Sequence, residues 1–349
     1  MNNILKRFLT ALVAVTLVTI LAACDDGKIN TAKDIPASPE VTHENNGGNL
    51  NDHITPVEIS NDRANRAVFI SQTNSLIRPF AWNDFDTYAP EFGFEMLLLA
   101  SELEPGVEIA GIEQALAEGY DAVFVFPSSI EPIIPALMQA KEAGLIVGMF
   151  SSELPPEYQQ YRDFFVGSDD TVSGKTAAEA IIAAFPNGAN VIEIGGQDGH
   201  DAQVKRSKGF RMGIEGTNVM VLDSQNCPNG WSSDEAKTMM EDFIVRYGDK
   251  IDVVFCHWDY GASGAIEALQ SAGMTDVFVV GIEGNLTAYQ QIREGTQAVS
   301  IGISFASMAR LSLQNARILL DGGTVPEVNF VPFDVVTREN IDSFPEPSW

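Results

Sequence analysis

The sequence predicts an α/β protein with two similar Rossmann-like lobes, each built on a parallel sheet. Short apolar runs without polar alternation, such as 122–126 and 145–150, are typical of parallel strands that are covered on both faces. Helix-like segments of about 10–15 residues separate these runs and indicate strand–helix–strand units with right-handed crossovers. The pattern restarts midway, and 349 residues are enough for about two domains with a cleft between them.

The first run of elements forms one predicted lobe. Pro79 suits the first turn of a helix, and Gly119 and Gly144 follow helical segments as C-terminal signals. We expect strands at 67–71, 94–100, 122–126, 145–150 and 164–167, and helices at 78–92, 109–119 and 134–143.

The second run begins with a helix that Asp169 or Asp170 caps. Gly273 ends a later helix that carries apolar or small residues at helical spacing. We expect helices at 171–184, 205–215, 234–247, 260–272, 286–294 and 307–320, and strands at 191–196, 219–222, 253–259, 277–284, 298–303 and 330–336.

Two carboxylates end neighbouring strands of the unit over 253–284. Asp259 closes the first strand, and Glu283 closes the second. Ligands of open α/β sheets bind beyond the carboxyl ends of the strands, so both acids are placed to accept hydrogen bonds from a ligand. The alternatives are a cap on the next helix for Asp259, and a cap or hinge role for Glu283.

Composition and motifs exclude several function classes. The formal net charge of −27 argues against nucleic acid, because few basic groups are available to neutralise phosphates. No His, Cys or carboxylate cluster has metal-ligand spacing, so no metal or other cofactor is expected. The Gly-rich segment 195–199 lacks the G-x-G-x-x-G pattern, and no G-x-S-x-G elbow occurs. We therefore expect a protein that is not an enzyme.

The N-terminus reads as a targeting signal. Lys6 and Arg7 precede the apolar stretch 8–21, which is too short to span a bilayer comfortably. The stretch ends in Leu-Ala-Ala-Cys24, which resembles a bacterial lipobox and implies a lipoprotein signal peptide over 1–24 with lipidation at Cys24. Ordinary cleavage nearby and an unprocessed anchor are the alternatives. By resemblance to enterobacterial lipoproteins, Asp25 implies retention at the inner membrane.

Residues 25–61 read as a flexible acidic tether, because they lack an apolar period and cannot offset the entropy of ordering. Beyond the tether, only Cys227 and Cys256 remain, with Cys227 expected in a loop after a strand. In an oxidising compartment the two could form a disulfide, and the alternative is a pair of small buried thiols.

Five motifs stand in a fixed order along the folded part. They are Arg78-Pro79-Phe80, Gly167-Ser168-Asp169-Asp170, and the segments 259–265, 279–284 and 336–340. Together they resemble periplasmic sugar-binding proteins of the ribose/galactose-binding type, which have the type I periplasmic binding protein fold and serve ABC importers. The resemblance covers about 65–342.

This resemblance implies three crossings between the lobes, which form a three-strand hinge. They fall near Ser168-Asp169, near Ile303-Ser304 and near Val331-Pro332. The N-terminal lobe then holds 62–168 plus 304–331, and the C-terminal lobe holds 169–303 plus 332–349. Closure about the hinge would trap the ligand.

The implied function is that of a substrate-binding protein of an ABC-type importer. It captures a sugar or sugar-like molecule in the cleft and delivers it to an inner-membrane permease. The implied location is periplasmic, with a monomer held to the inner membrane by its lipid. The alternative is a receptor that feeds a sensor kinase or chemoreceptor. A cytoplasmic sugar-responsive repressor would need an N-terminal DNA-binding helix pair, which the signal sequence replaces.

The family stacks aromatic side chains on the sugar ring and surrounds its edge with charged hydrogen bonds. Phe80 and Trp231 fall on stacking positions, and Trp82 is placed to supply a further ring. A core position is the alternative for each aromatic, and a solvated loop charge is the alternative for Arg78. The predicted ligand-binding residues are Arg78, Phe80, Trp82, Ser151, Ser152, Trp231, Trp258, Asp259, Glu283 and Ser304.

The chain departs from a ribose site at several positions. Ser151-Ser152 stand where ribose binders carry Asp-Arg, and Val204 aligns with a cleft arginine, although Lys205 and Arg206 are adjacent. Several charged partners of a pentose are therefore missing. We expect a cleft that is more aromatic and less densely polar than a ribose site, and neither ribose nor galactose is predicted as the ligand.

Overall fold

The computed structural model describes residues 64–72 and 78–347, and for residues 78–80 it describes the backbone alone. The predicted signal peptide (1–24), the lipidation site Cys24 and the tether (25–61) lie outside the described residues. The first sheet has the strand order β11-β5-β4-β3-β1-β2, and all its pairs are parallel. Its strands are β1 (Asn65–Ser71), β2 (Phe94–Ala100), β3 (Ala122–Phe126), β4 (Ile146–Phe150), β5 (Phe164–Gly167) and β11 (Val328–Phe330).

The second sheet has the order β12-β10-β9-β8-β6-β7. It is parallel except for β12, which pairs antiparallel with β10. Its strands are β6 (Asn190–Gln197), β7 (Met220–Cys227), β8 (Val253–Cys256), β9 (Phe278–Glu283), β10 (Val299–Gly302) and β12 (Asp334–Thr337).

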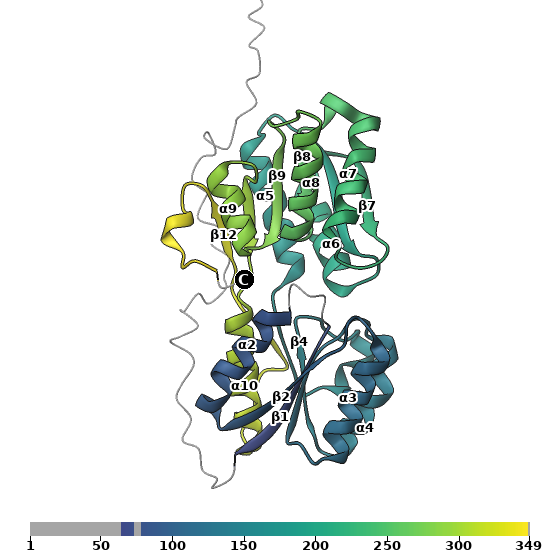
Figure 1. Cartoon of the computed structure of the whole chain (residues 1–349), viewed down its shortest axis with the longest axis vertical. Coiled ribbons are helices and arrows are strands. Elements are labelled where there is room, and N and C mark those ends of the chain that lie inside the picture. Colours follow the sequence, from purple (N-terminus) through teal and green to yellow (C-terminus); the bar gives the residue numbers. More distant parts are fainter. Residues whose placement is uncertain (1–63, 73–77, 348–349) are drawn as a thin grey trace, which may run out of the picture. The chain divides into compact units, whose positions relative to one another are not determined.

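Helices cover both faces of each sheet, as buried parallel strands require (Figure 1). Apolar side chains of the first sheet pack against α3 (Pro105–Ala117) and α4 (Ile134–Glu142) on one face. On its other face they pack against α2 (Arg78–Tyr88) and α10 (Phe305–Leu320). The second sheet packs against α5 (Asp170–Ala184) and α6 (Asp201–Ile214) on one face and α7 (Ser233–Tyr247) and α8 (Asp259–Ser271) on the other, with α9 (Leu286–Glu294) next to α8.

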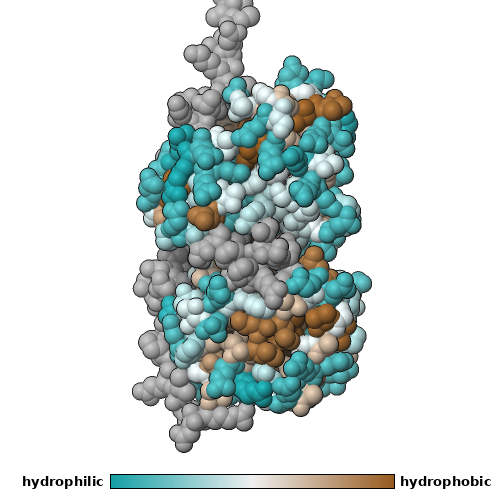
Figure 2. Space-filling view, in the orientation of Figure 1, coloured by the Kyte–Doolittle hydropathy of each residue, from teal (hydrophilic) through white to brown (hydrophobic). Residues whose placement is uncertain are grey.

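Short 3₁₀ helices complete the described chain at Ala89–Phe92, Glu131–Ile133, Pro156–Tyr161, Gly248–Lys250 and Ile341–Ser343. Figure 2 shows a group of apolar residues on the surface of the first lobe. The edge strand β2 of this lobe's sheet has half-buried residues from Met96 to Ala100. Among the described residues, no helix has the length and apolar content that crossing a bilayer requires.

Within the described residues the chain passes between the two sheets at three places. These are the connections from β5 to α5, from β10 to α10 and from β11 to β12. The predicted strand 330–336 is wrong in this respect, because it is two strands, β11 and β12, in different sheets. The sheets are parallel as predicted, and β12 is the one antiparallel strand among the described residues, at an edge position that tolerates such a partner.

Several other element boundaries differ from the prediction, and Asp259, which was expected to end a strand, begins α8. Helix α3 begins at Pro105, because proline fits the first helical position, and α6 begins at Asp201 behind the cap His200. Cys227 ends β7 and is not in a loop, because pairing with β6 extends the strand to it. Cys227 and Cys256 are both buried and free, so the structure holds no disulfide between them.

Helices α5 and α6 approach each other closely through glycine. A Cβ on Gly174 would lie 2.0 Å from the carbonyl oxygen of Arg206, and one on Gly209 would lie 1.9 Å from that of Thr171. No side chain fits at such distances, so the two backbones are in direct contact. This contact places α6, and with it Arg206, against the start of α5.

We expect Gly209→Ala to lower the free energy of unfolding by about 1–3 kcal/mol, because its methyl group would overlap the Thr171 carbonyl. Urea denaturation measures the change. Gly106→Ala is the matched control, since a Cβ at Gly106 in α3 would meet no atom within 4 Å. It should be neutral or stabilise by about 0.5–1 kcal/mol through helix propensity. Equal effects of the two substitutions would contradict the close helix contact.

Candidate functional site

A cavity with an empty volume of about 400 Å³ lies between the two sheets, at the carboxyl ends of their strands. This position is typical of small-molecule sites in α/β proteins. We call it the interlobe cavity. Its lining residues come from both sheets and from the hinge: Gln72, Phe126, Ser151, His200, Ala202, Arg206, Trp231, Glu283, Ile303 and Phe305.

Trp231 forms the aromatic wall on the side of the second sheet. Its ring lies directly on Gly196, where a Cβ would come within 2.0 Å of it. The edges of His200 and Trp258 hold it as well, with centroid distances of 5.3 and 5.5 Å and interplanar angles of 87° and 86°. Trp231 is thus fixed before a ligand arrives, which lowers the entropy cost of stacking.

Trp258 is a support for this wall and does not line the cavity, which corrects its prediction as a ligand contact. Its side chain is 2% exposed and lies in the core between β8, α7 and α8. The ring covers Gly261, where a Cβ would lie 2.6 Å away from it. The opposite wall carries Phe126 and Phe305, whose ring centroids are 6.4 Å apart.

Arg206 supplies a buried cation to the cavity wall. Its Nε donates to Asp170 Oδ1 at 2.7 Å, and its Nη1 donates to the carbonyl of His257. These two contacts fix the guanidinium. Its remaining N–H groups have no hydrogen-bond partner among the described residues and are available to a ligand. Sequence alignment pointed to Val204 instead, which is 51% exposed. The sequence could have indicated that Arg206 is buried, because it lies one helical turn from both Ala202 and Phe210 and shares their face of the helix.

His200 caps α6 and reaches the other lobe. Its Nδ1 accepts from the backbone N–H of Ala202 at 3.2 Å. Burial, together with the nearby Arg206, lowers the pKa of His200 to about 4, so the ring is neutral at pH 7. The ring proton must then be on Nε2, which donates to Ser152 Oγ at 3.4 Å.

Two more hydrogen bonds join the rims of the lobes near this contact. The backbone N–H of Glu153 donates to Asp201 Oδ2 at 3.4 Å, and Gln197 Nε2 donates to the carbonyl of Ser128 at 3.5 Å. All three bonds are long and weak, so the rims are in contact without being locked.

Glu283 places an unpaired carboxyl group at the cavity. Its residue is 7% exposed, and Oε2 has no hydrogen-bond partner among the described residues. Its backbone has a φ of 121°, which is strained for a residue with a side chain. Burial, and then repulsion from Asp259, raises the pKa of Glu283 to about 8, although Arg206 opposes this. At pH 7 the group is therefore protonated and can both donate and accept.

Asp259 does not face the cavity, which corrects its prediction as a ligand contact. It is fully buried and accepts hydrogen bonds from Gln297 Nε2 at 2.7 Å and Ser300 Oγ at 2.8 Å. It also accepts from the backbone N–H groups of Gly284 at 2.6 Å and Asn285 at 3.4 Å. Both carboxylate oxygens are bonded inside the lobe, so Asp259 anchors the turn that follows Glu283.

The other predicted residues take varied positions. Ser151 lines the cavity with a φ of 60°, and Ser152 touches it through His200. Ser304 is not in the interlobe cavity, since its Oγ caps α10 by accepting from the N–H of Ser307 at 3.1 Å. Trp82 is half-buried against the core of the first lobe and does not line the cavity either. Arg78 and Phe80 begin α2, and their side chains lie outside the described residues.

Of the residues predicted from the sequence, Ser151, Trp231 and Glu283 line the interlobe cavity, and Ser152 contacts its lining residue His200. Sequence reasoning missed lining residues that carry no motif of their own: Gln72, Phe126, His200, Arg206 and Phe305.

Comparison with known proteins identifies related chains. Residues 61–324 match the family model described as a periplasmic binding protein domain. The ribose import binding protein RbsB of Escherichia coli (strain K12) is 25% identical over 252 residues, covering 72% of this chain and 83% of the relative. The xylitol-binding protein of Mycolicibacterium smegmatis is 26% identical over 272 residues, covering 74% and 72%.

Solved structures show the same fold. A galactofuranose binding protein superposes with a TM-score of 0.75 at 22% identity, covering 80% of this chain and 96% of the other. An ABC transporter solute binding protein from Bacillus halodurans C-125 with bound myo-inositol superposes with a TM-score of 0.74 at 23% identity, covering 82% and 98%. These structures confirm the predicted two-lobed α/β fold.

Glu283→Gln should make stability less dependent on pH. The pKa of Glu283 is about 8 in the folded chain against an ordinary value of 4.5. The folded state therefore holds an extra proton between these values, and stability falls as pH rises through that window. We expect the variant to gain stability relative to the parent chain between pH 5 and 9, by on the order of a few kcal/mol.

Urea denaturation at a series of pH values measures this gain. Glu241→Gln, at an exposed position of α7, is the control and should leave the pH profile unchanged. Parallel profiles for Glu283→Gln and the parent chain would show that Glu283 does not hold the proton.

Proposed function

The chain belongs to the periplasmic binding protein family, and on this premise we propose that it captures a neutral sugar or polyol in the interlobe cavity for an ABC importer. Membership of the family makes it a substrate-binding protein and implies a periplasmic location. The observation that carries the proposal is the fixed ring of Trp231 beside the unpaired, protonatable carboxyl group of Glu283. Together these present an apolar platform and a polar edge, which are the two surfaces of a sugar ring.

The charge balance of the cavity favours a ligand without net charge. Arg206 is paired with Asp170 through a 2.7 Å contact. Glu283 is protonated at pH 7, because its pKa is about 8, and His200 is neutral, because its pKa is about 4. A sugar acid would bring an uncompensated charge into this buried site, which is costly. A neutral polyol can use Arg206 as donor and Glu283 as donor and acceptor.

The names of the relatives support the same ligand class. They include binding proteins for ribose, xylitol and galactofuranose, and related solved structures carry myo-inositol and D-allose. All of these compounds are neutral and rich in hydroxyl groups. The relatives named as import proteins also favour delivery to a permease over the sensory alternative.

In the proposed complex, Trp231 and Phe80 stack on the ring from opposite lobes. Arg78, Arg206, Ser151 and Glu283 would bind its hydroxyl groups, and charge-assisted bonds of this kind reject analogues that leave them unpaired. In this complex Arg206 would donate charged hydrogen bonds to the ligand, as the Asp-Arg pair that this chain lacks does in ribose binders.

We also propose that binding closes the lobe 62–168 plus 304–331 onto the lobe 169–303 plus 332–349. The strand membership of the two sheets supports this division. The rim contact of Ser152 with His200 is one that closure would shorten. The closed pair of lobes then forms the surface for the permease. The capture involves no chemical step and no cofactor.

The proposal that the protein is attached to the membrane is based on the sequence alone. We propose that the signal peptide over 1–24 directs lipidation at Cys24, and that the acidic tether over 25–61 holds a monomer near the outer face of the inner membrane. The tether would reach roughly 30–35 Å as a flexible chain.

A thermal-shift screen of the protein without its signal peptide tests the ligand class. We expect a raised melting temperature with one or more neutral pentoses, hexoses, inositols or pentitols, because a ligand that binds only the folded state stabilises it. Glucuronate and gluconate should have no effect. A shift with the acids alone would overturn the neutral class, and silence across the whole panel would argue against a sugar site.

Trp231→Ala should weaken binding of the sugar found in that screen by about 1–3 kcal/mol, because it removes stacking and buried area. Titration calorimetry measures the loss. Phe330→Ala is the control, since Phe330 is 49% exposed on β11 and lines none of the cavities described here. Equal affinities of Trp231→Ala and the parent chain would remove Trp231 from the site.

A further inference from the structure

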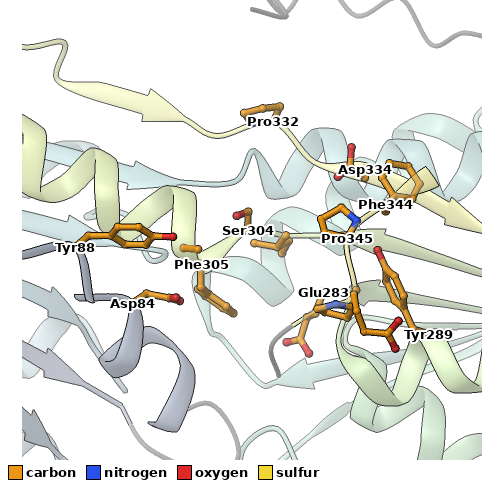
Figure 3. A pocket seen from close by; sticks show the side chains of 16 residues that line it. Asp84, Tyr88, Glu283, Tyr289, Ser304, Phe305, Pro332, Asp334, Phe344 and Pro345 are labelled. Carbon is orange, nitrogen blue, oxygen red and sulfur yellow. The ribbon is translucent and has the colours of Figure 1, made fainter. Parts of the chain in front are cut away.

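A second hollow, with an empty volume of about 1040 Å³, opens at the hinge (Figure 3). It shares Glu283, Ile303 and Phe305 with the interlobe cavity, and all its other lining residues are different. We call it the hinge groove. Its walls are Asp84 and Tyr88 of α2, the segments 283–284 and 302–306, Tyr289 of α9, Pro332, Asp334 and the C-terminal segment 344–347.

The groove is acidic. Asp84, Glu283, Asp334 and Glu346 line it, and none of its lining residues is basic. Glu346 is balanced by Arg293, which donates to it at 2.9 and 3.0 Å. Within the described part of the chain, the side chains of Asp84 and Asp334 make neither a hydrogen bond nor an ion pair. Figure 3 shows Asp84 on one side of the groove and Glu283 and Asp334 on the other.

Glu283, which lines both hollows, adds a second observation to the acidic lining of the groove. Its residue is 93% buried, and its Oε2 is without a partner among the described residues. Burial raises the pKa of Asp84 to about 6, and burial with the charge of Asp259 raises the pKa of Glu283 to about 8. The pKa of Asp334 is also raised by burial. Asp84 and Glu283 are desolvated, and Asp334 adds a third acid at an exposed position. No basic side chain lines the groove, so a cation bound there would lower the cost of ionising these acids.

We propose that the hinge groove is a second binding site, for an alkyl diamine or polyamine. The arrangement argues against a metal ion, because no three His, Cys, Asp or Glu side chains in the described chain are close enough to share one. A diamine carries two ammonium groups that reach separated carboxylates, and each has three N–H donors for them. Tyr88, Tyr289 and Phe344 line the groove for the methylene chain and for cation–π contact.

The inference does not depend on the sugar proposal. Asp84 and Asp334 line the hinge groove and are absent from the interlobe cavity, so amine binding can be measured without any sugar. Because the two residues belong to different lobes, a bound diamine would hold both lobes at the hinge.

Titration calorimetry of putrescine and spermidine into the protein as isolated from cells, in 150 mM NaCl at pH 8, tests the site. We expect one amine bound per chain, and affinities weakened about tenfold or more by Asp84→Asn and by Asp334→Asn. Asp86→Asn is the matched control, because it removes the same charge from an exposed position of the same helix outside the groove. Its affinity should equal that of the parent chain.

Several outcomes would overturn the proposal. Many weak sites, or equal weakening by Asp86→Asn, would mean general attraction of polyamines to a chain of net charge −27. Displacement of the bound amine by an equal concentration of Mg²⁺ or tetramethylammonium would exclude a site that accepts hydrogen bonds from ammonium N–H groups, because neither ion carries them. Far-UV circular dichroism of both variants controls for folding, and the two variants test the site independently from opposite lobes.

Discussion

The candidate site depends on one buried carboxylate. Asp259 accepts four hydrogen bonds. Two come from the side chains of Gln297, just before β10, and Ser300 of β10, and two come from the backbone of the turn after Glu283. Gly281 leaves room for it, since a Cβ there would lie 2.0 Å from Asp259 Oδ1. Gly284 has a φ of 74° and lies against Gly302 of the next strand. This packing fixes the turn and holds Glu283 in its strained conformation.

A second buried network orients the cation of the interlobe cavity. Arg206 is held by Asp170 and by the carbonyl of His257, while the ring of His257 meets Glu193 at 3.1 Å. Removing one partner of such a buried pair leaves an uncompensated charge and costs about 3–5 kcal/mol. The glycine contact between α5 and α6 brings Asp170 and Arg206 together, so helix packing and cavity charge are set by the same backbone approach.

The fold was predictable from the sequence because buried parallel strands carry a clear apolar signal and the motifs occur in family order. The site was only partly predictable, because a residue's position along the chain does not fix the direction of its side chain. Val254 and Cys256 face α7 and α8 from β8, and Trp258, two residues beyond the strand's last residue, continues the same alternation into the core. The role of Asp259 could not be predicted, since the sequence pattern of a carboxylate after a strand is the same whether its side chain binds a ligand or the protein's own backbone.

Glu283 lies where two electrostatic environments meet. On the side of the interlobe cavity its neighbour is Arg206, which lowers its pKa, and on the side of the hinge groove its neighbours are acids. A protonated Glu283 suits a neutral ligand, and an ionised one suits an ammonium group. Because one side chain lines both hollows, whatever fills one of them changes the protonation of a wall of the other. Occupancy of the two hollows would therefore be linked through a single proton, and the linkage would act equally in both directions.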